Sequence, residues 1–130
     1  MAVASSSMTL DTNIIIAYLN DEKRVISFLD EIRTRGKLLF LPAVVEAEFL
    51  SFAKWSPGER QTMERFLEEN FLFVPLDRPL TRLAANLRTK TKIPFADATI
   101  AATALFTNTP LLTRNVRDFK RVDSLQIVSL

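Results

Sequence analysis

The chain has 130 residues, contains neither Cys nor His, and carries a formal net charge of only +2. This length suits one domain, and a hydrophobic share of 48% with 25% charged residues excludes a disordered or collagen-like chain. The absence of Cys and His excludes disulfide scaffolds, zinc and iron–sulfur sites with those ligands, thiol nucleophiles and Ser-His-Asp hydrolysis. Any catalysis must therefore use carboxylates, hydroxyls, amides and cations.

The charges are unevenly divided between the two parts of the chain. Residues 1–76 carry 8 Lys and Arg against 11 Asp and Glu, whereas residues 77–130 carry 9 against 4. This asymmetry favours a polyanionic partner such as nucleic acid, although a solvated surface of mixed charge gives the same pattern.

The beginning of the chain carries no targeting signal. Residues 1–7 lack the basic flank and the apolar segment of a secretory signal, so we expect a flexible leader or a cloning remnant there. A single domain is expected over residues 8–130. No apolar run approaches the roughly 20 residues of a membrane-spanning helix, which predicts no membrane association and a cytoplasmic location.

Short apolar runs alternate with segments of helical periodicity along the rest of the chain. Gly36 is typical of the residue that follows a helix, Pro42 is expected at the first position of a helix, and Ser56 with Glu59 predicts a capping box. The expected strands are residues 8–10, 38–41, 71–74, 111–113 and 126–128, and the expected helices are residues 13–19, 21–35, one from 42 onward, 56–70, 77–90, 95–106 and a short one before the last strand.

This order of elements predicts an α/β fold, with an open parallel sheet covered by helices on both faces. Ligands of such sheets bind beyond the carboxyl ends of the strands, so polar residues at those ends are candidates for a site. These residues are Asp11 and Asn13 after the first strand, Glu46 and Glu48 after the second, Asp97 on the helix before the fourth, and Thr113, Arg114, Asn115 and Asp118 after it.

One of the two glutamates is expected to face this site. On a helical wheel Glu48 shares a stripe with Val44 and Phe52 on the apolar side, whereas Glu46 points about 160° away. Because a desolvated carboxylate needs a partner, Glu48 is either a site residue or a rim residue that reaches solvent. A shift in the phase of the helix would exchange the roles of the two residues.

The three candidate aspartates each have a structural alternative. Asp11 suits a helix N-cap, Asp97 suits the first turn of a helix, and Asp118 suits a cap pair with Asn115. Together with Glu48, however, they come from four segments that meet at the same sheet edge, where carboxylates repel one another unless a cation lies between them. Oxygen ligands alone select a hard ion, which predicts Mg²⁺ or Mn²⁺ and phosphoryl chemistry.

Four stretches that carry these acids resemble the PIN-domain ribonucleases, and most of all the toxins of VapBC-type toxin–antitoxin pairs. They are L-D-T-N-I-I at residues 10–15, P-A-V-V-E-A-E-F at 42–49, F-A-D-A-T-I-A-A-T-A at 95–104 and L-T-R-N-V-R-D-F at 112–119. The resemblance covers residues 8–130. It implies a three-layer α/β fold whose five-stranded parallel sheet has the order 3-2-1-4-5.

The resemblance also implies a set of functional residues. The acidic metal ligands and catalytic residues would be Asp11, Glu48, Asp97 and Asp118, supported by Asn13, Thr113 and Asn115. We interpret the chain as an endoribonuclease dependent on Mg²⁺ or Mn²⁺, and the resemblance implies products that carry a 5′-phosphate and a 3′-hydroxyl. Arg114, Arg117 and Lys120 flank the last acidic motif and are candidates for RNA-backbone contacts, with a solvated loop face as the alternative.

The resemblance further implies partners, namely a cognate antitoxin protein and a second copy of the chain in a homodimer. Other functions stay open at this point. They are a housekeeping PIN-domain RNA-processing nuclease, a catalytically silent PIN binding module, and a phosphoryl transferase of the haloacid dehalogenase type. The last of these places a second Asp where this chain has Asn13.

Overall fold

The structure is a computed structural model that describes residues 6–130. These residues form strands and helices in the order that the sequence predicts. The strands are β1 (Met8–Leu10), β2 (Leu39–Pro42), β3 (Leu72–Val74), β4 (Leu111–Leu112) and β5 (Ile127–Val128), and the helices are α1 (Thr12–Leu19), α2 (Lys23–Thr34), α3 (Ala43–Ser51), α4 (Pro57–Asn70), α5 (Arg78–Thr91), α6 (Phe95–Thr107) and α7 (Val116–Phe119).

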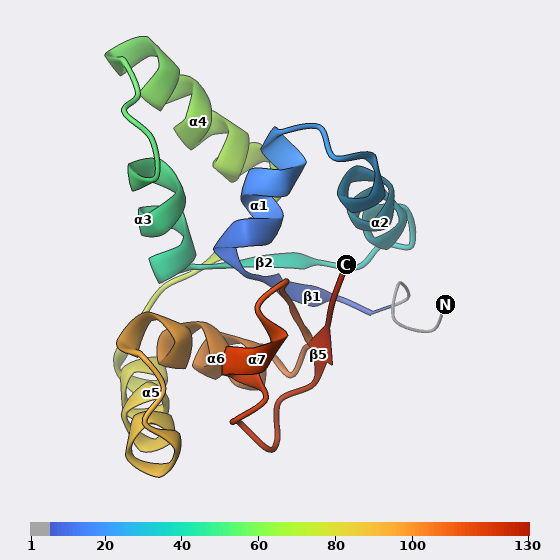
Figure 1. Cartoon of the computed structure of the whole chain (residues 1–130). Helices are drawn as coiled ribbons and strands as arrows, with labels where there is room; N and C mark the ends of the chain where they lie inside the picture. Colours follow the sequence, from blue (N-terminus) through green and yellow to red (C-terminus); the bar gives the residue numbers. More distant parts are fainter. Residues whose placement is uncertain (1–5) are drawn as a thin grey trace.

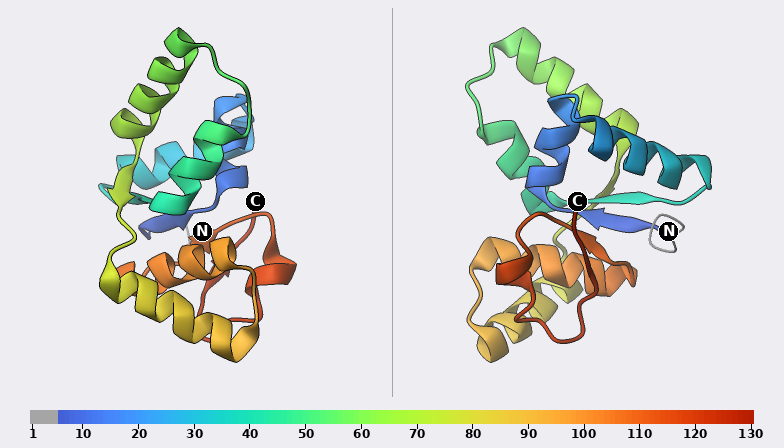
Figure 2. Two further views of the ribbon diagram at one scale, coloured as in Figure 1. Left: turned by 90° about the vertical axis from the view of Figure 1, so that its left-hand side faces the viewer. Right: turned by 45° about the vertical axis from the view of Figure 1, so that its right-hand side comes forward.

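The five strands form one parallel sheet in the order β3-β2-β1-β4-β5, which confirms the expected order. Helices α1 to α4 cover one face of the sheet, and α5 to α7 cover the other (Figure 1). Figure 2 shows the two helical layers on opposite sides of the strands. Because β1 is the central strand, Asp11 at its carboxyl end lies between the ends of the neighbouring strands β2 and β4.

Helix α6 is the most deeply buried helix of the second layer. Its residues from Ala98 to Ala104 are all buried, and four of these seven are alanines, which lets the helix approach the sheet closely. The hydroxyls of Thr99 and Thr103 donate to backbone carbonyls of the preceding turn, so neither is left unpaired. This packing holds the first turn of α6, which carries Asp97, at the same edge of the sheet as Asp11.

The local signals in the sequence have different outcomes. The capping box is confirmed, since Ser56 N donates to Glu59 Oε1 (2.8 Å) and Glu59 N donates to Ser56 Oγ (3.2 Å). Gly36 follows α2 with φ of 72°, as expected for a residue that ends a helix. The placement of Pro42 is wrong: Pro42 is the last residue of β2 and the N-cap of α3, with ψ of 145°. A proline φ near −65° suits an extended strand end as well as a helix start, so the pattern could not distinguish the two.

The start of the chain is only partly covered by the structure. Residues 1–5 of the expected leader lie outside the described residues. Ser7, also expected in the leader, accepts a hydrogen bond from Leu38 N through its hydroxyl oxygen (2.8 Å). Within residues 6–130, no helix is long and apolar enough to cross a membrane.

Candidate active site

Asp11 lies at the carboxyl end of the central strand and is also the N-cap of α1. Its side chain accepts hydrogen bonds from Thr12 N (2.7 Å), Thr113 Oγ1 (2.7 Å) and Asn13 Nδ2 (3.3 Å). The residue is only 7% exposed, and burial raises the pKa of its carboxyl above the ordinary value although these hydrogen bonds oppose the shift. The capping role and a role in the site therefore coexist at Asp11.

Glu48 approaches Asp11 from helix α3. The hydroxyl of Thr12 donates to Glu48 Oε1 over 2.5 Å, which joins α1 to α3 next to the end of β1. The expected apolar stripe of Glu48 is wrong in detail, because Val45 and Phe49 form the buried face of α3 while Phe52 is 46% exposed. Glu48 lies beside that buried face, half-buried, where it reaches Thr12.

Glu46 points to a different part of the molecule. Burial raises the pKa of its carboxyl, and so do the negative charges of Glu68 and Glu64 on α4. Glu46 thus faces the neighbouring helix, whereas Glu48 is held at the end of β1.

Asp97 lies in the first turn of α6 and faces the other three acids. Burial raises the pKa of its carboxyl to about 6, with further contributions from the negative charges of Asp11, Asp118 and Glu48. Within residues 6–130 its side chain makes no hydrogen bond, and α6 has no side-chain cap. The structural alternative for Asp97, a place in the first turn of a helix, is present, and it coexists with the position of Asp97 near the other acids. We call Asp11, Glu48, Asp97 and Asp118 the acidic site.

Asp118 is placed by a chain of hydrogen bonds that begins at Asp11. Thr113 Oγ1 donates to Asp11 Oδ2 and accepts from Asn115 N (2.9 Å). Asn115, the N-cap of α7, then donates from Nδ2 to Asp118 Oδ2 (2.9 Å). The pairing of Asp118 with Asn115 is thus present, and it orients one Asp118 oxygen within the acidic site.

The candidate RNA contacts differ in their availability. Arg114 makes two hydrogen bonds with Glu22, from Nη2 to Oε1 (2.6 Å) and from Nη1 to Oε2 (3.2 Å), and its backbone N–H donates to Asn13 Oδ1 (3.2 Å). Arg117 and Lys120 are exposed, and neither forms an ion pair within residues 6–130. Arg114 is therefore already paired with Glu22, whereas Arg117 and Lys120 form no ion pair within residues 6–130 and are available to bind RNA.

The donor chemistry of the acidic site fits a hard divalent ion. Its side chains offer carboxylate oxygens only, and burial together with the negative charges of the other three carboxylates raises the pKa of Asp97, so a cation among them would be stabilising. In the described part of the chain, no three acidic side chains are placed so that they could hold one ion between them. A hydrated ion bound through one or two carboxylates matches this spacing, and Mg²⁺ commonly binds in that way.

Comparison with protein families identifies the fold. Residues 8–125 match the model of the PIN domain. The chain belongs to the PIN-domain family. PIN domains are nuclease domains, and they generally use divalent metal ions.

Solved structures of similar fold cover nearly all of this PIN domain. VapBC2 from Rickettsia felis, bound to a DNA fragment from its promoter, superposes with a TM-score of 0.81 at 22% identity, covering 95% of this chain and 98% of the other. DNA-bound VapBC from Salmonella typhimurium gives 0.80 at 18% identity, with 95% and 97% covered. FitAcB from Neisseria gonorrhoeae gives 0.71 at 25% identity, with 93% and 96% covered. No curated protein matches the chain.

Two residues of the site region were missed by the sequence analysis. Thr12 follows Asp11 directly, but nothing in its position predicts a bond to a glutamate 36 residues away. Glu22 lies between two helices and pairs with Arg114 across 92 residues, again without a local signal.

Proposed function

We propose that this PIN domain is a metal-dependent endoribonuclease and that it acts as the toxin of a toxin–antitoxin pair. The observation that carries the nuclease assignment is the acidic site itself, in which carboxylates from four segments come together. Burial, and after it the negative charges of Asp11, Asp118 and Glu48, raises the pKa of Asp97 there. A structural cluster gains nothing from such repulsion, whereas a site that binds a cation and a phosphodiester requires it.

Three carboxylates of the acidic site accept hydrogen bonds from neighbouring side chains, and the fourth, that of Asp97, accepts none within residues 6–130. Asp11 and Asp97 would hold Mg²⁺ or Mn²⁺, and Glu48 and Asp118 would contact the ion through water. When bound, such an ion lowers the pKa of a coordinated water and neutralises charge on the phosphate. Asp11, Glu48 and Asp118 are held by Thr113, Thr12 and Asn115, respectively.

One carboxylate of the acidic site would accept a proton from the water that attacks phosphorus. Asp97 has no side-chain hydrogen-bond partner within residues 6–130, so its oxygens are available to the ion. Asn13 and Thr113 position Asp11 without changing protonation themselves.

The test is cleavage of total RNA with and without Mg²⁺ or Mn²⁺, comparing the wild type with Asp11→Asn and mapping the ends of the products. We expect metal-dependent cleavage that leaves a 5′-phosphate and a 3′-hydroxyl and is lost in the variant. Cleavage that persists in EDTA or in Asp11→Asn would contradict the assignment. RNA binding without cleavage would favour the silent binding module.

The toxin assignment is supported by the VapBC and FitAcB structures, which are toxin–antitoxin complexes of the same fold. A cognate antitoxin would cover the acidic site, since an Arg or Lys of the partner forms charge-assisted hydrogen bonds with carboxylates and competes with the metal. We further propose a homodimer of the catalytic chain. A housekeeping RNA-processing nuclease is the alternative, and it predicts no antitoxin gene beside this one.

A further inference from the structure

The charged side chains of helix α5 and its C-cap are all positive and exposed. Arg78, Arg82, Arg88, Lys90 and Lys92 are all exposed, and none forms an ion pair within residues 6–130. No acidic residue occurs between positions 78 and 96. These five residues are called the α5 basic face.

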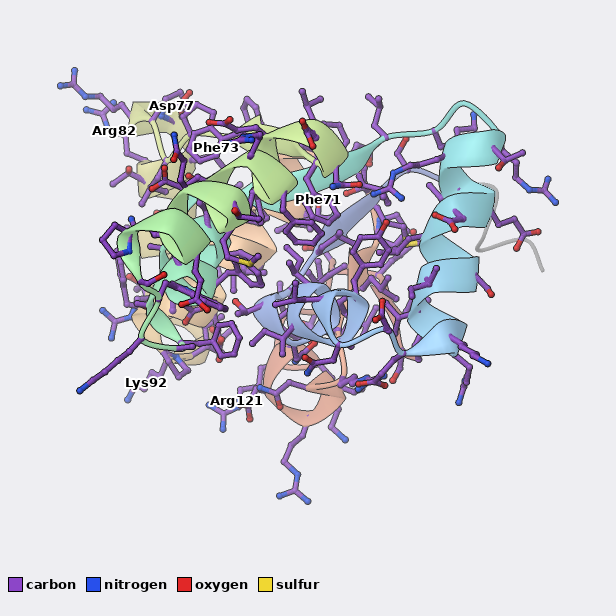
Figure 3. The ribbon with its side chains drawn as sticks, turned by 90° about the horizontal axis from the view of Figure 1, so that it is seen from above. Phe71, Phe73, Asp77, Arg82, Lys92 and Arg121 are labelled. Atoms are coloured by element: carbon purple, nitrogen blue, oxygen red, sulfur yellow. The ribbon has the colours of Figure 1, made fainter. Side chains whose placement is uncertain are left out.

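The C-terminal end of α5 is close in sequence to the acidic site. Lys92 and Asp97 are five residues apart, so their Cα atoms cannot be more than about 18 Å from each other. Helix α5 has 14 residues and is about 21 Å long. Figure 3 shows Arg82 and Lys92 on the same side of the molecule; Arg82 lies in the second turn of α5, and Lys92 is its C-cap.

An exposed aromatic residue, Phe95, lies between Lys92 and Asp97 in the sequence. Phe95 is 55% exposed although it begins a helix that is otherwise mostly buried, and it is two residues before Asp97. An exposed aromatic ring near several cations suits single-stranded nucleic acid, because unpaired bases stack on aromatic rings while cations bind the phosphates.

We propose that Phe95 and the α5 basic face form a binding surface for single-stranded RNA, which leads the strand to Asp97. This inference rests on the proposed nuclease function and assigns the surface of this chain that would bind its RNA. Phe95 would stack with a base next to the cleaved bond, and Arg82, Lys90 and Lys92 would contact the phosphates that follow.

Other partners fit this surface less well. A membrane-bound basic helix needs a free apolar face, but Leu80, Ala84 and Leu87 of α5 are buried in the core. A second copy of the chain would place like charges against each other. Duplex nucleic acid offers phosphates to the cations, yet its stacked bases cannot reach Phe95.

The test measures binding separately from cleavage. A fluorescein-labelled single-stranded RNA is titrated with protein in EDTA at several salt concentrations, and a gel confirms that it stays intact. The first variant is Arg82→Gln/Lys90→Gln/Lys92→Gln, which keeps Arg88 because its Nε donates to Ile93 O. Its control is Lys23→Gln/Arg24→Gln/Lys37→Gln, the same loss of charge from exposed residues on and next to α2, in the opposite helical layer (Figure 1).

We expect the α5 variant to lower the slope of log Kd against log salt by about 2, since each phosphate contact to a single strand contributes about 0.7. The α2 control should keep the wild-type slope. Phe95→Leu should weaken binding at least about fivefold, and Phe106→Leu, from a residue that is also 55% exposed but lies at the other end of α6, should not. Duplex DNA of equal length should respond to the charge variant but not to Phe95→Leu.

Several results would overturn the inference. They are equal slopes for the two charge variants, equal affinity for Phe95→Leu and Phe106→Leu, tighter binding to duplex DNA, or binding to vesicles that contain phosphatidylserine in place of RNA. The expected binding pattern without any metal-dependent cleavage would leave the surface standing and refute the nuclease. Cleavage that is unaffected by all four variants would refute the surface and leave the nuclease standing.

Discussion

The hydroxyl of Thr12 donates a hydrogen bond to Glu48 Oε1 over 2.5 Å, while the backbone N–H of the same residue donates to Asp11. Thr12 thereby fixes the positions of two carboxylates that come from β1 and α3. A hydrogen bond to a charged acceptor is worth more than a neutral one, so this contact sets where Glu48 lies.

Replacing Thr12 with Val removes the hydroxyl and keeps the shape. We expect Thr12→Val to lower kcat for RNA cleavage about tenfold or more, because Glu48 loses the bond that orients it. Thr12→Ser should keep most of the activity. The control is Thr62→Val, which removes an exposed hydroxyl that bonds only to Gly58 O. If Thr12→Val lowers kcat equally when Glu48 is already Gln, Thr12 does not act through Glu48.

The two glutamates of α3 should respond differently to neutralisation. Glu48→Gln should suppress cleavage far more than Glu46→Gln, since only Glu48 reaches the acidic site. Glu46→Gln should leave kcat unchanged and raise the melting temperature slightly, because the charge of Glu46 is disfavoured by burial and by Glu64 and Glu68. Equal cleavage rates of the two variants would show that the assignment of Glu48 is wrong.

Neutralising an aspartate of the acidic site should separate activity from stability. We expect Asp11→Asn and Asp97→Asn each to abolish cleavage and to keep or raise the melting temperature in EDTA, because each removes one of several repelling charges. The Asn side chain can still accept the bond from Thr12 N at position 11. A loss of several degrees in both variants would mean that these residues mainly stabilise the fold.

The raised pKa of Asp97 predicts a pH dependence of stability with a definite sign. The folded protein binds this proton below about pH 6, whereas the unfolded chain binds it only near the ordinary value of 3.8. Protonation of Asp97 therefore raises the free energy of unfolding as the pH falls from 7 to 5, and this contribution is lost as the pH rises again. Thermal melting in EDTA should show this gain in the wild type. The gain should be smaller in Asp97→Asn, where Asp11 and Glu46 still contribute with the same sign.

The toxin assignment predicts a growth phenotype. Expression of the chain should inhibit growth unless the product of an adjacent antitoxin gene is co-expressed, and Asp97→Asn should be harmless. Sedimentation of the purified chain should give a dimer. A monomeric, harmless product that still cleaves RNA would refute the toxin assignment and leave the nuclease in place.

Much of the fold could be predicted because its signals are local. Helix periodicity, Gly36 after α2 and the Ser56–Glu59 box each act within a few residues of sequence, and they placed the elements in the correct order. Pro42 was misplaced by one position, since the same proline conformation is compatible with a strand end and a helix start. The apolar stripe predicted for α3 was wrong in detail, because a helical wheel gives only the directions of side chains relative to one another. Which side is buried depends on what packs against it.

The sequence by itself determined which chemistry is available: a parallel α/β sheet, no Cys or His, and carboxylates at the ends of successive segments. The tertiary structure alone decided that Thr12 holds Glu48, that Glu22 pairs with Arg114, and that Phe95 is exposed beside the basic face of α5. These contacts join residues from separate elements, and their geometry follows from how α1, α3 and α6 pack on the sheet. Periodicity describes each helix about its own axis, whereas the approach of two helices is set by the whole core between them.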